Sequence, residues 1–272
     1  MNAIKLVDAI RANAPKATIG GTKYFVVEND RKVPESKLLA YANEVIAGFS
    51  PDEPAPEKLE GLVAATIDGK PMRWALPMIL KWSIDTATFD GKPSELEKAK
   101  AICSEATEDW NSAAKQLGIL DSIHFEEDAS DPLFTFAFSN FGNPNLYAVA
   151  FFPNDPASER IINIGPATFA DPSSFDPVGV IRHELGHVLG FRHEHIRPES
   201  KEGMSWWEKS QMEQWVVGKI GAEVLTPHDS QSVMHYPLNG MGTLDFELSD
   251  ADKAGFKKLY TLPTDQVREF DK

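Results

Sequence analysis

A histidine-rich stretch at residues 182–195 constrains this chain more than any other feature. Its five fixed positions fill the spacing H-E-x-x-H-x-x-G-x-x-H and are His183, Glu184, His187, Gly190 and His193. On a helix, His183 and His187 lie one turn apart on the same face, so their imidazoles can bind one metal ion. Gly190 follows at a point where a helix that ends and reverses needs a residue tolerant of positive φ. The stretch therefore predicts a helix, a sharp turn and a third ligand, His193, that returns to the same ion.

The predicted ligand set indicates a catalytic zinc site. Three neutral imidazoles leave one Zn²⁺ ion with an open position, at which the pKa of a bound water falls from about 15.7 towards ~7. Glu184 lies about 100° round the helix from His183, too far to be an equal ligand but well placed to act on that water as general base. Hydrolysis of a peptide bond by zinc-activated water is the chemistry that this set supports. His124 and His228 lie outside any ligand spacing and are predicted to be non-catalytic.

A second motif lies downstream, in the segment Ser232-Val233-Met234-His235-Tyr236-Pro237. A methionine followed by an aromatic residue is by itself more often core packing than a functional motif. After a three-histidine site, however, the segment resembles the Met-turn that lies beneath the zinc of metzincin peptidases. Glu194 directly after the third histidine and Met-His-Tyr at the turn make the chain similar to the astacin-type metalloendopeptidases, one metzincin branch. The resemblance runs from about Gly69 to Tyr260 and is densest at 178–198 and 230–237.

This resemblance implies an α+β metzincin fold, with a twisted mixed sheet and the zinc helix above the cleft and a helix-rich C-terminal half below it. It also implies that Tyr236 is an extra zinc ligand that swings away to stabilise the oxyanion, and that Met234 packs beneath the histidines. In the family, Glu194 is a partner of the processed N-terminus. No cleavage site for such processing is evident in this sequence.

Net charge and cysteine count limit the partners and the covalent chemistry. The chain has 272 residues and a net charge of −14, which disfavours nucleic acid or an anionic membrane as a partner because the electrostatic field would repel both. The expected partner is a protein or peptide substrate, and the expected state is a monomer. Cys103 is the only cysteine, so no intrachain disulfide can form, whereas secreted members of the family usually carry two. Its place in a helical pattern predicts a small buried hydrophobe rather than a zinc switch.

The sequence does not decide the cellular compartment of the protein. The first twenty residues do not resemble a signal peptide, because Lys5, Asp8 and Arg11 interrupt any apolar region. The longest apolar runs also fall short of the ~18 residues of a membrane span. The sequence alone indicates the cytoplasm, whereas the family resemblance indicates secretion.

Residues 1–60 are predicted to form a small unit and a linker ahead of a catalytic domain at 61–272. The expected elements of the unit are helices at 3–13 and 34–47 and a strand at 23–27. Three prolines between residues 51 and 56 mark the linker. In astacin zymogens a propeptide aspartate occupies the open position of the metal, and Asp30 is a candidate for that role. A turn-capping aspartate after a strand is the alternative.

The catalytic domain is expected to alternate strands and helices. Strands are predicted at 80–84, 123–125, 133–138, 147–152 and 160–164. A long helix should have Ser94 as its N-cap, with Glu97 at the capping-box position. The zinc helix should begin at Asp176-Pro177, and further helices should follow Ser205 and Ser249. Residues 147–151 hold the position of the metzincin edge strand, which would pair with extended substrate; an ordinary sheet strand is the alternative.

The sequence thus predicts a zinc-dependent endopeptidase. His183, His187 and His193 are the expected ligands, Glu184 the general base and Tyr236 the oxyanion stabiliser. One alternative is a matrixin- or serralysin-like peptidase, although the calcium-binding Gly-Asp repeats of serralysins do not occur. The other is an inactive zinc-holding binding module, against which the intact Glu184 argues.

Overall fold

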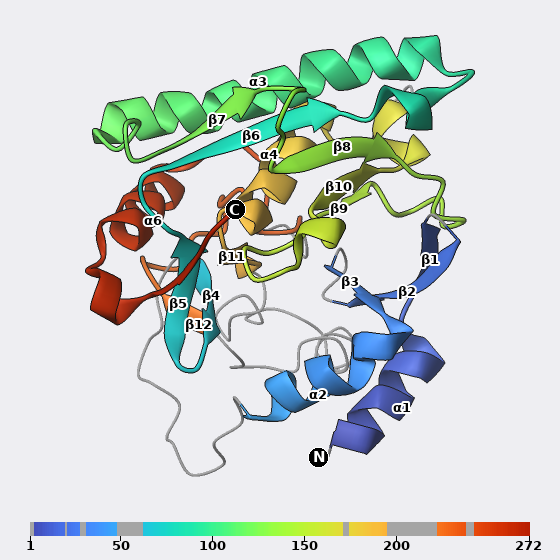
Figure 1. Cartoon of the computed structure of the whole chain (residues 1–272), viewed down its shortest axis with the longest axis horizontal. Helices are drawn as coiled ribbons and strands as arrows, with labels where there is room; N and C mark the ends of the chain where they lie inside the picture. The colour runs from blue at the N-terminus through green and yellow to red at the C-terminus, as the bar shows by residue number, and fades with distance from the viewer. Residues whose placement is uncertain are drawn as a thin grey trace.

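A five-stranded mixed sheet forms the centre of the α+β fold, as the resemblance implied. The computed structural model describes residues 3–19, 21–27, 31–47, 62–170, 174–194, 222–237 and 242–272. The strand order is β7-β6-β8-β10-β9 (Figure 1). The strands are β6 (Met78–Ile84), β7 (Ile123–Glu127), β8 (Phe134–Phe138), β9 (Ala148–Val149) and β10 (Ile161–Ile164). The first four in this order are parallel, and β9 runs antiparallel to β10 at the edge.

The long helix α3 (Pro93–Leu117) packs against β7 and against the zinc helix α4 (Pro177–Val188) (Figure 1). Its buried side chains recur at helical spacing, and Cys103 is fully buried among them, as predicted. The prediction that Ser94 caps this helix was wrong. Lys92 is the N-cap and Pro93 is the first helical residue, where proline's fixed φ fits and its missing N–H costs nothing.

A second sheet, which the sequence analysis did not predict, joins distant parts of the chain. Its order is β11-β4-β5-β13, and β12 also pairs with β4. The strands are β4 (Val63–Ile67), β5 (Lys70–Trp74), β11 (Phe191–Arg192), β12 (Ala222–Val224) and β13 (Arg268–Phe270). Strand β11 directly follows the zinc helix, so this sheet fixes the path of the chain between the second and third histidines.

The N-terminal unit has its own small core. Its elements are α1 (Ala3–Asn13), β1 (Lys16–Ile19), β2 (Thr22–Val27), β3 (Arg31–Pro34) and α2 (Leu38–Ala47). Leu6, Ile10, Phe25 and Leu38 are among the buried residues of this core. The helix predicted from residue 34 begins at Leu38, after a 3₁₀ turn at Glu35–Lys37. Asp30 and the proline-rich linker lie outside the described residues.

Helix α6 (Asp250–Thr261) begins with a capping box between Ser249 and Asp252, which accords with the predicted start after Ser249. The helix predicted after Ser205 lies outside the described residues. Short 3₁₀ turns occur at Thr86–Phe89, Ala157–Glu159, Pro166–Phe169 and Thr264–Gln266.

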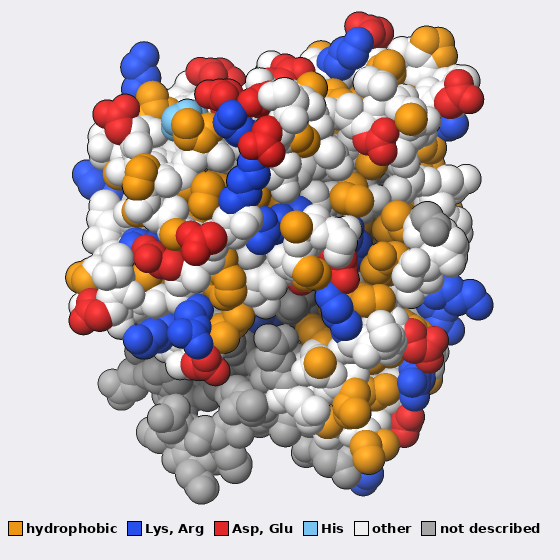
Figure 2. Space-filling model, in the orientation of Figure 1, with side chains coloured by type: hydrophobic (Ala, Val, Ile, Leu, Met, Phe, Trp, Pro, Cys, Tyr) orange, Lys and Arg blue, Asp and Glu red, His pale blue; other side chains and the backbone are white. Residues whose placement is uncertain are grey.

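In the part of the chain that the structure describes, every helix is too short or too polar to cross a membrane. Figure 2 shows acidic and basic side chains intermixed over one face of the molecule.

Candidate metal centre

The zinc helix begins where the sequence predicted. Asp176 is its N-cap and accepts a hydrogen bond from the Gly179 amide at 2.8 Å, and Pro177 is the first helical residue. The side chains of Ile181, Leu185 and Val188 are fully buried in the main core. These contacts orient the opposite face of the helix, with its two histidines, towards His193 and the Val233 carbonyl oxygen.

Gly190 makes the turn that returns the chain to the site. Its φ is 97°, and an added Cβ would lie 2.7 Å from the Met72 carbonyl oxygen of β5, so both backbone conformation and space favour glycine. The Gly190 carbonyl accepts a hydrogen bond from the Ala65 amide at 2.8 Å. The turn is therefore held against the β4–β5 hairpin, and the following strand β11 leads to His193.

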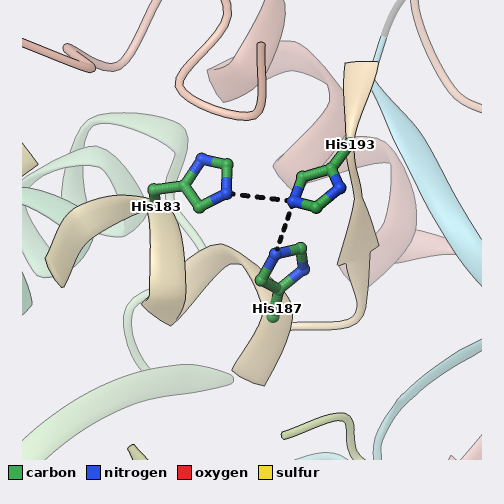
Figure 3. Close-up of side chains that lie close together, drawn as sticks. All are labelled: His183, His187 and His193. Atoms are coloured by element: carbon green, nitrogen blue, oxygen red, sulfur yellow. Dashed lines mark hydrogen bonds between the residues drawn. The ribbon is translucent and has the colours of Figure 1, made fainter. Parts of the chain in front are cut away.

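The three predicted ligands converge through their Nε2 atoms (Figure 3). His193 Nε2 lies 3.1 Å from His187 Nε2 and 3.2 Å from His183 Nε2. In a tetrahedral zinc site with Zn–N bonds of about 2.05 Å, two ligand nitrogens lie about 3.3 Å apart. The spacing of the three nitrogens therefore fits a single Zn²⁺ ion.

Hydrogen bonds at the Nδ1 atoms set the tautomers of two of these rings. His183 Nδ1 lies 2.6 Å from the Val233 carbonyl oxygen, and His187 Nδ1 lies 2.7 Å from the Phe191 carbonyl oxygen. A carbonyl oxygen only accepts, so each Nδ1 carries the proton and donates. Each Nε2 is thereby left with its lone pair directed at the centre, which is the form in which histidine binds a metal.

All three imidazoles are buried, with exposed fractions of 1–3%. Their potential ligand atoms lie within 4.8 Å of one another. Three neutral nitrogen donors in a dry site suit Zn²⁺, which prefers histidine and cysteine ligands, over the oxygen-seeking Ca²⁺ and Mg²⁺. His124 is not part of this cluster; its Nδ1 lies 3.0 Å from the Leu120 carbonyl oxygen. His228 is not part of it either.

Glu184 and Tyr236 both lie close to the histidine cluster. Glu184 follows His183 on the zinc helix, and its exposed fraction is 3%. The Tyr236 ring is half-buried, and its centroid lies 4.9 Å from that of His193 and 5.2 Å from that of His183. The fold thus brings Tyr236, which is distant in sequence, against two of the ligand rings.

Met234 packs beneath the site, as the resemblance implied. Its side chain is fully buried, and a Cβ added at Gly186 would overlap its sulfur atom. Glycine at the second variable position of the H-E-x-x-H motif therefore allows the Met-turn to approach the zinc helix closely. Glu194 joins the same turn, because its amide donates to the Met234 carbonyl oxygen at 2.8 Å and its Oε1 accepts from the Asp229 amide at 3.1 Å.

Distant residues that the sequence analysis did not single out hold the zinc helix in place. Trp74 Nε1 donates to the Val188 carbonyl oxygen at 2.7 Å, and the Tyr260 hydroxyl donates to that of Leu189 at 3.0 Å. Arg182 donates twice to Asp109 of α3, at 2.6 and 2.9 Å. The Trp74 and Tyr260 contacts satisfy backbone carbonyls at the C-terminal end of the helix, which lack helical partners, and the Arg182 contacts attach the helix to α3. No local sequence pattern predicts them, because each partner is far away in the chain.

Comparison with known proteins places the similarity over this centre. Residues 171–247 match the family model Astacin (Peptidase family M12A). Zinc metalloproteinase nas-38 of Caenorhabditis elegans is 33% identical over 110 residues, which cover 38% of this chain and 15% of that protein. Bone morphogenetic protein 1 of Xenopus laevis is 33% identical over 130 residues, which cover 36% of this chain and 18% of that protein. The match thus spans less than a fifth of either relative.

A solved structure titled "Structure of myroilysin" aligns with 74% of this chain and 99% of that chain, at 19% identity and a TM-score of 0.47. This likeness is too distant to support an argument about function. The family match instead covers α4, the three histidines and the Met-turn. Over this zinc-binding region, the chain is therefore similar to the astacin-type metzincin peptidases.

Proposed function

We propose that this protein is a zinc-dependent endopeptidase that hydrolyses peptide bonds in proteins. The observation that carries the proposal is the convergence of three buried Nε2 atoms, two of them from the zinc helix that also carries Glu184. The matched relative from Caenorhabditis elegans is named a zinc metalloproteinase, and the family model Astacin matches the region that contains these residues. The reaction and the role of Glu184 are inferred from the chemistry of the site, and the role of Tyr236 is inferred from the family resemblance.

Each side chain has a distinct role in the proposed reaction. Zinc, when bound by His183, His187 and His193, supplies a Lewis acid and lowers the pKa of water. Glu184 accepts a proton from the attacking water on a carboxylate oxygen and later delivers it to the leaving amine. Its burial strengthens this interaction, because a dry site has a low effective dielectric constant. The Tyr236 hydroxyl donates a hydrogen bond to the developing oxyanion.

Strand β9 is the proposed docking edge for the substrate. It is the outermost strand of the main sheet and runs antiparallel to β10. An extended peptide can add to such an edge through main-chain hydrogen bonds, while pockets select side chains. The prediction at 147–152 located this strand, but its paired part is confined to Ala148–Val149.

The N-terminal unit packs beside this edge, and we assign it as a pro-segment-like unit of residues 1–60 ahead of a catalytic domain at 61–272. Ala17 of β1 and Val26 of β2 share a buried cluster with Val149 of β9. The Lys37 ammonium forms an ion pair with Glu159 at 2.6 Å. Lys32 Nζ donates to the Ile161 carbonyl oxygen at 3.0 Å. Apolar and polar contacts thus attach the unit next to the strand that substrate would use.

Lys32 also lies within electrostatic range of the proposed base. Burial lowers the pKa of Lys32 to about 8, and the carboxylates of Asp155, Glu159 and Glu184 partly oppose that shift. This electrostatic interaction supports the proposal that the N-terminal unit packs on the side of the molecule that carries the metal centre.

Replacement of Glu184 by glutamine tests the proposed reaction. The change keeps the shape of the side chain and removes the base, so zinc content should remain near that of the wild type. Peptide hydrolysis should fall at least by the 10²–10⁴-fold typical of acid–base catalysis. The matched control is Glu97→Gln on the exposed surface of α3, which should leave hydrolysis unchanged.

Two results would count against the proposal. Undiminished turnover in Glu184→Gln would show that this carboxylate is not the base. A wild-type chain that binds zinc but cleaves neither casein nor a peptide library would instead indicate the inactive zinc-holding module.

A further inference from the structure

The Met-turn connects one zinc ligand to a buried carboxylate on the C-terminal helix. Asp252 of α6 is fully buried, and its Oδ2 accepts hydrogen bonds from the Val233 amide at 2.8 Å and the Ser249 amide at 3.0 Å. Its Oδ1 accepts from the Ser232 hydroxyl at 2.5 Å. One carboxylate therefore contacts both the helix cap and the turn beneath the metal centre.

A continuous series of hydrogen bonds leads from this carboxylate to His183. The His183 Nδ1–H donates to the Val233 carbonyl oxygen at 2.6 Å. The amide of the same peptide group, that of Met234, donates to Ser232 Oγ at 3.0 Å. The Ser232 hydroxyl in turn donates to Asp252 Oδ1. Every donor points in the same direction, so each bond polarises the next.

This direction has a consequence for the metal ligand. A polarised carbonyl oxygen is a stronger acceptor, and it draws the Nδ1 proton of His183 more firmly. The imidazole then carries more electron density at Nε2 and is a better zinc ligand, as when a carboxylate accepts directly from a ligating histidine. Asp252 has the negative charge that this effect needs at neutral pH, because burial raises its pKa only to about 6.

We propose that Ser232 and Asp252 are positioning residues that fix the orientation of His183 and strengthen it as a zinc ligand through the Val233–Met234 peptide group. His183 is held in this way from α6, whereas His187 donates to the Phe191 carbonyl oxygen of β11. The proposal rests on the proposed function only in taking the three histidines as the zinc site. It concerns metal affinity and can be tested without peptide hydrolysis.

We call the series of hydrogen bonds from His183 to Asp252 the relay. Zinc affinity, measured on the full chain by competition with a chromogenic chelator at pH 7.5, tests it. Asp252→Asn keeps the size of the side chain and removes its charge, and zinc affinity should fall about 10–100-fold. Ser232→Ala interrupts the series while Val233 can still donate to Asp252, and affinity should fall in the same direction. Because both changes break one series, the double variant should be no weaker than Asp252→Asn alone.

Ser249→Ala is the matched control. Ser249 Oγ accepts from the Asp252 amide at the helix cap, and its hydroxyl is not part of the series to His183. This variant should lower the thermal stability of the chain and leave zinc affinity unchanged. The absorption bands of the Co²⁺-substituted protein should shift in Asp252→Asn and Ser232→Ala but not in Ser249→Ala.

The outcomes separate the relay from a merely structural role and from the peptidase proposal. Wild-type zinc affinity in folded Asp252→Asn and Ser232→Ala chains would overturn the relay. If Asp252→Asn does not fold, the folded Ser232→Ala chain decides, because it retains the Asp252 contacts to α6. A wild-type chain that binds zinc tightly but cleaves no peptide would refute the peptidase proposal and leave the relay intact.

Discussion

At the scale of single residues, the spacing of the histidine motif predicts much of the metal centre. Two ligands one helical turn apart and a glycine at the reversal require no knowledge of the tertiary structure. The partners that orient them are different. The Val233 and Phe191 carbonyl oxygens accept from two of the rings, and Asp252 accepts from the Val233 amide. Val233 and Asp252 are distant in sequence, so only the folded chain brings them to this centre.

The proposed role of Tyr236 depends on its hydroxyl group alone, so removal of that group tests it. If the phenol donates to the tetrahedral intermediate, Tyr236→Phe loses a transition-state contact of roughly 2.7–4 kcal/mol, or 10²–10³-fold in kcat. KM and zinc content should change little, because the three histidines still bind the metal. Steady-state kinetics with a quenched fluorescent peptide measures both constants. A variant as fast as the wild type would favour a matrixin-like site, in which this tyrosine only packs.

At the scale of helices and strands, local patterns predicted the elements with long, regular sequence signals. Helices α1, α3 and α4 and the strands β2, β6 and β10 have apolar residues at helical or alternating spacing. The β4–β5 hairpin was not predicted, because Ala64, Ala65 and Pro71 give it a weak strand signal. Strands β11 and β13 have two and three residues, and their pairing depends on partners far away in sequence.

The capping box of α6 gives a prediction about pH. Burial raises the pKa of Asp252 from its ordinary value of 3.8 to about 6, so the folded state binds more protons than the unfolded state between about pH 4 and 6. The stability that this group contributes is complete below about pH 4 and is lost as the pH rises through 6. Asp252→Asn cannot ionise and should not show this loss.

Thermal unfolding of the zinc-free chains measures this difference. The melting temperature of Asp252→Asn minus that of the wild type should increase between pH 4 and 7 and then become constant. Asp250→Asn, on the exposed side of the same helical turn, is the control and should follow the wild-type curve. A difference that is independent of pH would contradict the assigned pKa.

At the scale of the whole molecule, two cores divide the chain. The N-terminal unit has a core of its own, and the main core contains side chains of the zinc helix, α3, α6 and the Met-turn. The boundary predicted near residue 60 rests on the prolines of the linker. How the unit contacts β9 and β10 was not predictable, because Lys32, Lys37 and Val149 carry no motif.

If the N-terminal unit obstructs the substrate edge, its removal should increase activity. A chain that begins at Leu62 should cleave peptides much faster than the full chain, because the unit no longer competes with substrate for the edge beside β9. In the full chain, the double change Lys32→Ala and Lys37→Ala should produce part of that increase by removing two attachments. Lys23→Ala, on the exposed part of the same small sheet, is the control. Equal activity in all chains would mark residues 1–60 as part of the folded enzyme.

Metal removal and return on one sample tests the central claim most directly. The purified full chain should contain one zinc ion per chain, and a chelator should abolish casein digestion while the far-UV circular dichroism changes little, because a catalytic ion need not be essential for folding. One equivalent of Zn²⁺ should then restore digestion. A metal-free chain that digests casein at the full rate would contradict the account.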